Sequence, residues 1–296
     1  MEVAAESGGS AGTLAVAGDS LNTAVYLARL GIRAAFATVL GADSPARRIR
    51  SLMQDDCIDA SFVLEKSGGS TGLYLSETDL SGERHFTYWR DQSAARDFLR
   101  MCRAAGLVDR LCDVPVMYLT GITLAVMSHD HGAFLQDMVR KVRSSGGRVA
   151  FDPNYRAALW HGRKKVAQTL IGWMCDNADW CLATDSDQTA LWGDQTARAA
   201  FMRLATRAGC EVVVKCGADG CLIGPDDRVV IPAPVAVIDT TGAGDSFDAA
   251  YLAARLQGAS VQEAAMAGHT LSATVIKARG AIVPRGNRDA LNVVRR

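Results

Sequence analysis

From about residue 110 onward, short apolar runs alternate with longer segments whose apolar residues recur at helical spacing. The short runs are typical of buried strands, and the longer segments are typical of amphipathic helices. The strands predicted in this way are Val114–Leu119, Val149–Asp152, Trp180–Ala183 and Val212–Lys215. The predicted helices are His131–Ser144, Lys164–Cys175, Gln195–Ala208 and Ser246–Leu256. This alternation predicts a mainly parallel, Rossmann-like α/β sheet flanked by helices on both faces.

Weaker patterns extend this outline at both ends of the chain. Residues 221–223 and 229–231 are expected to pair as a hairpin, and residues 235–238 to end a further strand. Residues 19–30 form an apolar stripe typical of a helix, with Asp19 as its expected N-cap and Gly31 as its stop.

Residues 60–90 differ from the rest, because they contain short β-prone runs separated by turn residues. The runs are Ser61–Glu65, Thr71–Ser76 and His85–Trp89. A surface hairpin is the simplest interpretation. A small β-sheet lid over a substrate is the other, and it would use Tyr74, Tyr88 and Arg90. In the last run the side chains alternate, so Tyr88 and Arg90 share one face.

Length and composition narrow the class of protein. The 296 residues suit a single α/β domain spanning 1–296. Lys plus Arg and Asp plus Glu both number 32, which gives no reason to expect nucleic acid or an anionic membrane as partner. The eight cysteines show no zinc-type spacing, and no apolar run is long enough to span a bilayer. We also find no signal-peptide pattern, and therefore expect a soluble cytoplasmic protein.

The most specific signal is the stretch DTTGAGDSF, Asp239–Phe247, between the last predicted strand and helix. A tight turn with Asp245 as helix cap is the simplest interpretation. However, small residues let backbone N–H groups approach an anion, and a helix N-terminus adds positive partial charge. We favour an anion site formed by Gly242, Ala243 and Gly244. The acid within it, Asp245, suits proton removal from a hydroxyl beside a phosphate.

Two common nucleotide-binding motifs do not fit this chain. A GxGxxG fingerprint fails because Phe247 stands where the third glycine belongs, and the chain contains no GK[ST] tripeptide of a P-loop. An NAD-dependent dehydrogenase is therefore disfavoured. Phosphoryl transfer to an alcohol is the reaction that the glycine loop and Asp245 favour.

Three further segments carry candidate binding residues. In VVKCGADG, Lys215 ends a strand, and Gly217 and Gly220 allow close backbone contact with a nucleotide. An exposed lysine at a strand end is the equal alternative. In FDPNYR, a strand leaves Asn154 and Arg156 at the carboxyl edge of the sheet, where ligands bind in such folds. Arginine recognises carboxylate or phosphate through paired hydrogen bonds, although a solvated side chain is common at such a position.

The stretch AGDSLN places a glycine turn and polar side chains at a helix start. Capping is the better explanation for Asp19, whereas Asn22 lies one turn into the helix and is the stronger candidate for ligand contact. We assign no histidine to metal binding or catalysis.

These segments, in this order, resemble the PfkB (ribokinase-like) family of carbohydrate kinases over residues 14–285. DTTGAGDSF is similar to the C-terminal motif of the family and AGDSLNTAVYLARLG to its N-terminal glycine motif. Other segments resemble the members that act on 2-keto-3-deoxygluconate: GLYLSE, GERHFTYWR, YLTGITLAVMS, FDPNYRAALW, VVKCGADGC and HTLSATVIKARGAIVP.

The resemblance implies a ribokinase-like core with a β lid, ATP as donor and Mg²⁺ as helper. It implies that Asp245 takes the proton of the terminal (6-) hydroxyl, with the glycine loop holding phosphate. Substrate contacts are implied for Gly18, Asn22, Tyr74, Tyr88, Arg90 and Arg156. Nucleotide contacts are implied for Asn154, Lys215, Gly217, Gly220, Gly242 and Gly244. Two converging cations favour an acidic sugar, and the open edges of a lid sheet favour a homo-oligomer.

The chain departs from the family pattern in two places. The family opens with a strand carrying a Gly-Glu step, whereas this chain has about thirteen unpatterned residues there, so we expect a truncated start or a missing strand. The NxxE segment linked to Mg²⁺ in the family reads Thr184-Asp185-Ser186-Asp187, which leaves Asp187 as the candidate metal ligand.

The leading hypothesis is therefore an ATP-dependent kinase of 2-keto-3-deoxy-D-gluconate. The alternatives are a PfkB-type kinase of another sugar, such as ribose or fructose, and a non-catalytic protein that binds a sugar acid or nucleotide.

Overall fold

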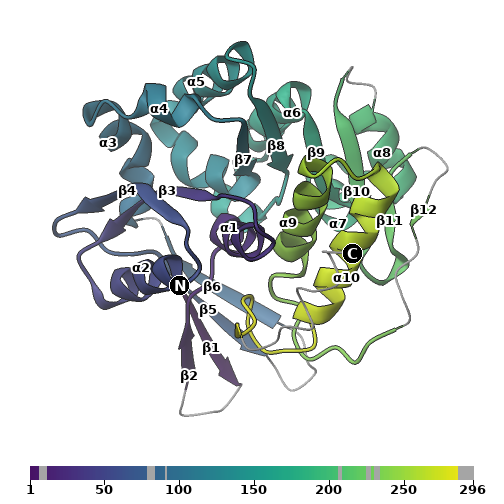
Figure 1. Ribbon diagram of the computed structural model, residues 1–296, viewed down its shortest axis with the longest axis horizontal. Helices are drawn as coiled ribbons and strands as arrows, with labels where there is room; N and C mark the ends of the chain where they lie inside the picture. Colours follow the sequence, from purple (N-terminus) through teal and green to yellow (C-terminus); the bar gives the residue numbers. More distant parts are fainter. Residues whose placement is uncertain are drawn as a thin grey trace.

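The computed structural model describes residues 1–6, 12–78, 84–90, 92–205, 209–224, 228–229 and 234–285. Within these residues the largest sheet has the strand order β12-β11-β10-β9-β8-β7 (Figure 1). Strands β7 to β10 are parallel, and β11 and β12 are antiparallel additions at one edge. The strands are β7 (Val116–Thr120), β8 (Arg148–Asp152), β9 (Trp180–Thr184), β10 (Glu211–Lys215), β11 (Cys221–Leu222) and β12 (Arg228–Val229). The predicted mainly parallel sheet and its terminal hairpin are confirmed.

Helices cover both faces of this sheet because its strands are apolar on both sides. On one face, Phe151 and Val214 pack in a cluster with α5 (Gly121–Ser144), α6 (Lys164–Asn177) and α8 (Ala197–Ala205). On the other face, Leu182 and Val213 pack with α9 (Ala243–Leu256) and α10 (Val261–Val275). Alternate residues of β8, β9 and β10 therefore serve opposite layers, which fixes the register of the sheet.

Two smaller sheets lie apart from the large one. A parallel pair consists of β3 (Ala35–Gly41) and β4 (Asp59–Lys66). A four-stranded sheet has the order β2-β1-β5-β6, from β2 (Gly12–Ala15), β1 (Glu2–Glu6), β5 (Leu73–Thr78) and β6 (Arg84–Trp89). In Figure 1 it extends below α1 and α2.

The first of the three β-prone runs between residues 60 and 90 does not join the other two in one sheet. The run Ser61–Glu65 belongs to β4 and pairs with β3, because Phe62 of this strand packs into the large apolar cluster of the molecule. The N-terminal residues, which carry no clear pattern, instead form β1 and β2 beside β5. Strand propensity alone gave no pairing partner, since pairing depends on residues distant in sequence.

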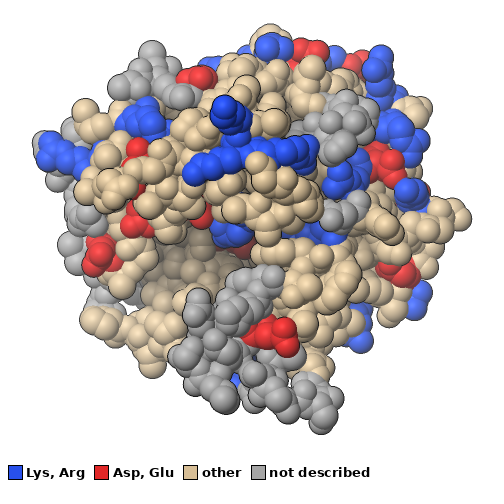
Figure 2. All heavy atoms as spheres, turned by 180° about the vertical axis from the view of Figure 1, so that it is seen from behind, with Lys and Arg blue, Asp and Glu red and all other residues tan. Residues whose placement is uncertain are grey.

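The remaining helices are α1 (Asp19–Arg29), α2 (Ser44–Asp55), α3 (Phe98–Ala104), α4 (Val108–Cys112) and α7 (Asp185–Trp192). No helix in the described part of the chain is long and apolar enough to cross a bilayer. The face turned away from the viewer in Figure 1 carries a hollow whose visible walls are mostly uncharged (Figure 2).

Three local predictions were wrong. Residues 235–238 form no strand, since the N–H groups of Ile238 and Asp239 donate to the carbonyl of Ile276 at the end of α10. Helix α5 begins at Gly121 rather than at His131, because the Thr120 side chain caps it by accepting from the Thr123 N–H. Asp19 is the first residue of α1 and does not cap it.

A buried ion pair ties α1 to the end of α2 and to the C-terminal segment. The Arg29 guanidinium donates to both carboxylate oxygens of Asp56, at 2.9 and 3.0 Å, and to the Val283 carbonyl at 2.6 Å. The Asp56 side chain is fully buried, and Arg285 also donates to it at 2.8 Å. Asp56 is thus satisfied by two cations.

Removing this carboxylate should be strongly destabilising. Asp56→Ala leaves the Arg29 charge buried without its partner, so we expect a loss of about 3–5 kcal/mol in the free energy of unfolding. Urea denaturation measures it. The neighbouring, exposed Asp55 is the matched control, and Asp55→Ala should change stability by less than about 0.5 kcal/mol. Equal losses in the two variants would contradict this assignment.

Candidate active site

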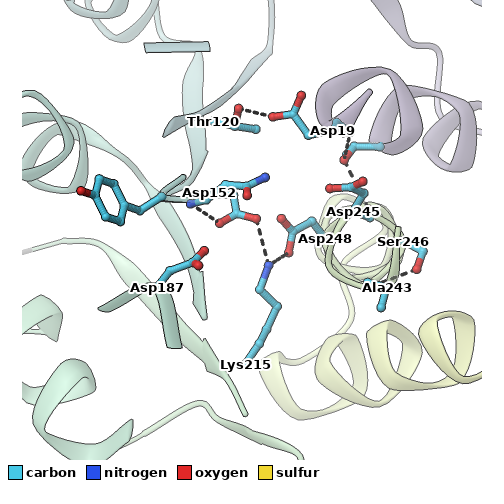
Figure 3. A network of polar contacts seen from close by, with 12 residues as sticks. Asp19, Thr120, Asp152, Asp187, Lys215, Ala243, Asp245, Ser246 and Asp248 are labelled. Carbon is cyan, nitrogen blue, oxygen red and sulfur yellow. Dashed lines mark hydrogen bonds and ion pairs between the residues drawn. The ribbon is translucent and has the colours of Figure 1, made fainter. Parts of the chain in front are cut away.

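The parallel strands bring polar residues together at their carboxyl ends. Thr120 ends β7, Asp152 ends β8 and Lys215 ends β10, and all three lie in the network drawn in Figure 3. The N-terminus of α9 enters this network from the other side. The structure therefore brings the segments FDPNYR, VVKCGADG and GAGD together in one network.

The glycine loop before α9 is held in a single conformation. Gly242 has φ +77°, and a Cβ there would lie 2.7 Å from the Ala281 carbonyl oxygen. Both the left-handed backbone conformation and the lack of space for a side chain therefore require glycine. Asp239 fixes the loop on both sides, because it accepts from the Thr241 N–H at 2.7 Å and from the Gly280 N–H at 2.8 Å. The first turn of α9, with Ala243 and Gly244, follows directly.

Asp245 lies in the first turn of α9 and contacts α1. Its carboxylate accepts from Asn22 Nδ2 at 2.7 Å, and its carbonyl accepts from the Thr23 hydroxyl at 3.3 Å. Burial and the Asp19 carboxylate nearby raise the pKa of Asp245, the hydrogen bond from Asn22 opposes them, and the resulting pKa is about 7. Near neutral pH this carboxyl can therefore both accept and release a proton.

Asp19 faces this site instead of capping its helix. Its carboxylate accepts from the Thr120 hydroxyl at 2.5 Å (Figure 3). The helix start is served by Asn22 instead, because Asn22 Oδ1 accepts from the Gly18 N–H at 3.2 Å. Two carboxylates, Asp19 and Asp245, thus line the same end of α1.

Lys215 is buried between two further carboxylates. Its ammonium donates to Asp152 at 3.1 Å and to Asp248 at 2.7 Å, and Asp248 also accepts from the Tyr118 hydroxyl at 2.9 Å. Burial alone would lower the pKa of Lys215, but Asp152 and Asp248 outweigh this effect and raise it. Lys215 therefore carries a fixed positive charge a short distance from Gly244, where a Cβ would lie 3.7 Å from its Nζ.

The residues after β8 point toward the same region. Asn154 has φ +29°, and its buried side-chain oxygen has no hydrogen-bond partner among the described residues. Arg156 donates to Asp187 at 2.9 Å, and the Arg156 side chain is 43% exposed, so its charge remains accessible to a ligand. Burial raises the pKa of Asp187 to about 6, and Arg156 opposes this shift.

The four-stranded sheet contributes two tyrosines, and an arginine directly follows its strand β6. Tyr74 and Tyr88 face each other across β5 and β6, and the Arg90 guanidinium lies 5.1 and 5.0 Å from the centres of their rings. The contact between Arg90 and the Tyr88 ring agrees with the prediction that these two side chains share one face. Tyr88 is also close enough to raise the pKa of Arg156, so this sheet and the end of β8 approach one another.

Gly217 and Gly220 form the turn after β10. Their φ values are +56° and +91°, and the Cys216 N–H donates to the Gly220 carbonyl at 2.8 Å. Both positions suit glycine, and the turn lies directly beyond Lys215.

Among the described residues, no group of three His, Cys, Asp or Glu side chains could hold a metal ion alone. Mg²⁺ in phosphate-transfer sites is often bound by one or two carboxylates together with substrate phosphates and water. The residues present fit that mode, with Asp187 as one carboxylate, and do not fit a metal site formed by protein alone.

Sequence reasoning missed several residues of this network, among them Asp19, Tyr118, Thr120 and Asp248. For Asp248 a signal existed, because it lies one helical turn after Asp245 and is charged within an otherwise apolar helix face. For Thr120 the signal was weaker, a hydroxyl at the end of a buried strand just before a glycine.

Known proteins match this chain over nearly its whole length. Residues 5–287 match the model of the pfkB family carbohydrate kinases. The chain is 40% identical over 278 residues to a 2-dehydro-3-deoxygluconokinase of Escherichia coli, with 90% of each chain covered. It is 37% identical to the 2-dehydro-3-deoxygluconokinase of Dickeya dadantii, with 90% of this chain and 89% of that one covered.

Among solved structures, the fold is similar to aminoimidazole riboside kinase from Salmonella enterica, solved with aminoimidazole riboside and an ATP analog. The TM-score is 0.80 and the identity 25%, over 99% of this chain and 96% of that one. The ribokinase-like fold expected from the sequence is confirmed.

The carboxyl of Asp245 offers a test of site electrostatics that needs no substrate. Its pKa is about 7 in the folded protein against an ordinary 3.8, so the folded state holds more protons between these values and loses stability as pH rises through them. Asp245→Asn removes this titration and keeps an acceptor for Asn22. We expect the Tm of the variant, relative to wild type, to be about 3–6 °C higher at pH 8 than at pH 5.

Calorimetry at both pH values measures this difference. The control is Asp137→Asn on the exposed side of α5, whose Tm relative to wild type should be the same at pH 5 and pH 8. A relative Tm of Asp245→Asn that is equal or lower at pH 8 would show that the carboxyl is not destabilised in the fold.

Proposed function

Because the chain belongs to the pfkB family of carbohydrate kinases, we propose that it transfers the γ-phosphoryl group of ATP to the terminal (6-) hydroxyl of 2-keto-3-deoxy-D-gluconate. This sugar acid is the 2-dehydro-3-deoxygluconate in the names of its relatives. The observation that carries the proposal is Asp245, a carboxylate with a raised pKa in the first turn of a helix, next to a glycine loop.

Asp245 acts as the general base. It accepts the hydroxyl proton while the substrate oxygen attacks the γ-phosphorus and the bond to the β-phosphate oxygen breaks. Asn22 orients the carboxylate through its 2.7 Å hydrogen bond. The N–H groups at the start of α9, from Gly242 to Gly244, stabilise the charge on the transferred phosphoryl group, because they are fixed before the reaction.

The acidic substrate is recognised by Arg90 and Arg156. Arg90 is stacked on the ring of Tyr88, and Arg156 lies close enough to Tyr88 to interact with it electrostatically. A carboxylate between them would accept charge-assisted hydrogen bonds. Gly18, Asn22 and Tyr74 complete the sugar site.

The four-stranded sheet acts as a lid over the sugar, since it supplies Tyr74, Tyr88 and Arg90. We further propose that its outer strands pair between subunits, because Trp89 on β6 is 58% exposed. A cytoplasmic location agrees with the eight free cysteines.

The nucleotide occupies the side of the site formed by the ends of β8 and β10. The Asn154 side-chain oxygen is a buried acceptor without a partner among the described residues, and the turn with Gly217 and Gly220 permits close approach. Lys215 supplies a fixed positive charge for the phosphates. Mg²⁺, bound with the nucleotide and Asp187, would neutralise phosphate charge.

Turnover gives the direct test. Purified protein should release ADP with 2-keto-3-deoxygluconate, and Asp245→Asn should lower kcat about 10²–10⁴-fold while Asp137→Asn retains activity. For the wild type, kcat/KM should fall about tenfold per pH unit below about 7, because the base becomes protonated. Turnover with fructose or ribose only would refute the substrate, and binding without ADP release would favour a non-catalytic protein.

The two arginines give a separate test of substrate class. Arg90→Met and Arg156→Met should each raise KM for the sugar acid about 10–100-fold, since each loses a charge-assisted hydrogen bond, and should change KM for ATP less than about threefold. Arg100→Met is the control, because Arg100 is exposed and paired with Asp97. A rise confined to KM for ATP would assign that arginine to the nucleotide instead.

A further inference from the structure

A buried ammonium group with two carboxylates lies at the centre of the network in Figure 3. Lys215 donates to Asp152 at 3.1 Å and to Asp248 at 2.7 Å. The side chains of all three residues are exposed by 8% or less. If both carboxylates were ionised, the cluster would carry one more negative than positive charge. An uncompensated charge buried this deeply is costly, so the cluster needs a further proton or a further cation.

The two carboxylates point toward each other across the Lys215 ammonium (Figure 3). Burial raises the pKa of Asp248 well above its ordinary value. Lys215 opposes this shift, whereas Asp152 adds to it through its charge and through a hydrogen bond. An ionised carboxylate only accepts hydrogen bonds, so a hydrogen bond between two carboxyl groups requires a proton on one of them. Carboxyl groups this close do not both ionise in a buried site.

Among the described residues, the groups that face the pair from neighbouring elements do not supply the missing positive charge. Tyr118, from β7, donates to Asp248 through a neutral hydroxyl at 2.9 Å. Asp245, one turn before Asp248 on α9, and Asp19 of α1 add negative charge. These carboxylates make a second ionised group in the cluster still less favourable.

Two basic side chains farther out do not balance the cluster either. Arg156, after β8, donates to Asp187 at 2.9 Å. His269, from α10, packs edge-on against Phe247 with 5.1 Å between the ring centres. Burial lowers the pKa of His269 to about 4, so this side chain is neutral at pH 7. Within the described part of the chain, a shared proton is therefore the way in which the cluster reaches charge balance.

We propose that Asp152 and Asp248 share one proton at neutral pH, which makes their cluster with Lys215 electrically neutral. The cluster borders the loop that we assign to phosphate, because a Cβ on Gly244 would lie 3.7 Å from the Lys215 Nζ. With the shared proton it adds no net negative charge there, whereas the fully ionised pair would repel phosphate. Nucleotide phosphate and the proton therefore bind cooperatively, and nucleotide affinity falls where high pH removes the proton. The effect on phosphate rests on the proposed function, and the shared proton rests on the network alone.

Infrared spectroscopy of the ligand-free protein tests the shared proton, because a protonated carboxyl group absorbs apart from an ionised one. We expect wild type at pH 8 to show a carboxylic-acid band that Asp152→Asn and Asp248→Asn both lack. In either variant the remaining carboxylate pairs with Lys215 alone and ionises. The control Asp137→Asn, on the exposed side of α5, should keep the band. A wild-type spectrum at pH 8 that equals the spectra of both cluster variants would overturn the proposal.

The free energy of the cluster gives a second check through a double-mutant cycle. Each single variant keeps the side-chain size and one counter-charge for Lys215, so Tm at pH 7 should change by less than about 3 °C. Asp152→Asn/Asp248→Asn leaves the ammonium buried without a counter-charge and should lower Tm by about 6 °C or more. The effects should therefore be non-additive. Additive changes in Tm would contradict a shared proton.

Binding of ADP tests the effect on phosphate. Calorimetry compares Asp245→Asn, in which the neighbouring carboxyl no longer titrates, with Asp245→Asn/Asp248→Asn. Between pH 7.5 and pH 9.5 the affinity of the first variant should fall about fivefold or more, and that of the second less than about twofold. An equal pH dependence would overturn the link to phosphate. If neither these variants nor wild type bind ADP, the nucleotide site of the proposed function is refuted, whereas the infrared band still decides the shared proton.

Discussion

The packing of α1 against α9 is the contact on which the site depends. These helices lie more than two hundred positions apart in the chain, and they are joined by Asn22, whose amide donates to Asp245, and by Thr23, whose hydroxyl donates to the Asp245 carbonyl. Tyr26, fully buried on the same helix, donates to the Ala281 carbonyl at 2.8 Å. A small shift of α1 would therefore change both the orientation of the base and the glycine loop, since Ala281 also contacts Gly242.

Ion pairing distinguishes the carboxylates of this crowded site. Asp152 and Asp248 accept from Lys215, whereas among the described residues the Asp245 carboxylate accepts from the neutral amide of Asn22 alone and lies near Asp19. The same chemical group thus has two roles in neighbouring positions. Carboxylates paired with a cation organise the site, and the unpaired one is available for proton transfer.

The sequence predicted the large sheet well because its strands and helices are determined locally, by apolar runs and periodicity. It predicted the place of Lys215 because a buried strand followed by a glycine turn puts this residue at the carboxyl edge of the sheet. It predicted the place of Asp245 because a glycine loop there begins a helix. It failed where a partner far along the chain decides the outcome. Strand β4 pairs with β3 rather than with β5 or β6, Asp19 binds Thr120 rather than capping its helix, and residues 235–238 bond to the end of α10.

The contact of Tyr26 with Ala281 also has a consequence for biosynthesis. A chain emerging from the ribosome exposes α1 early, yet the residues that bury its inner face, from α9 and the segment after α10, emerge last. The large sheet from β7 to β12 can assemble in the meantime, because its strands follow one another closely in the chain. This face of α1 therefore stays exposed until synthesis is nearly complete, and this interval is when the nascent chain most needs protection from aggregation.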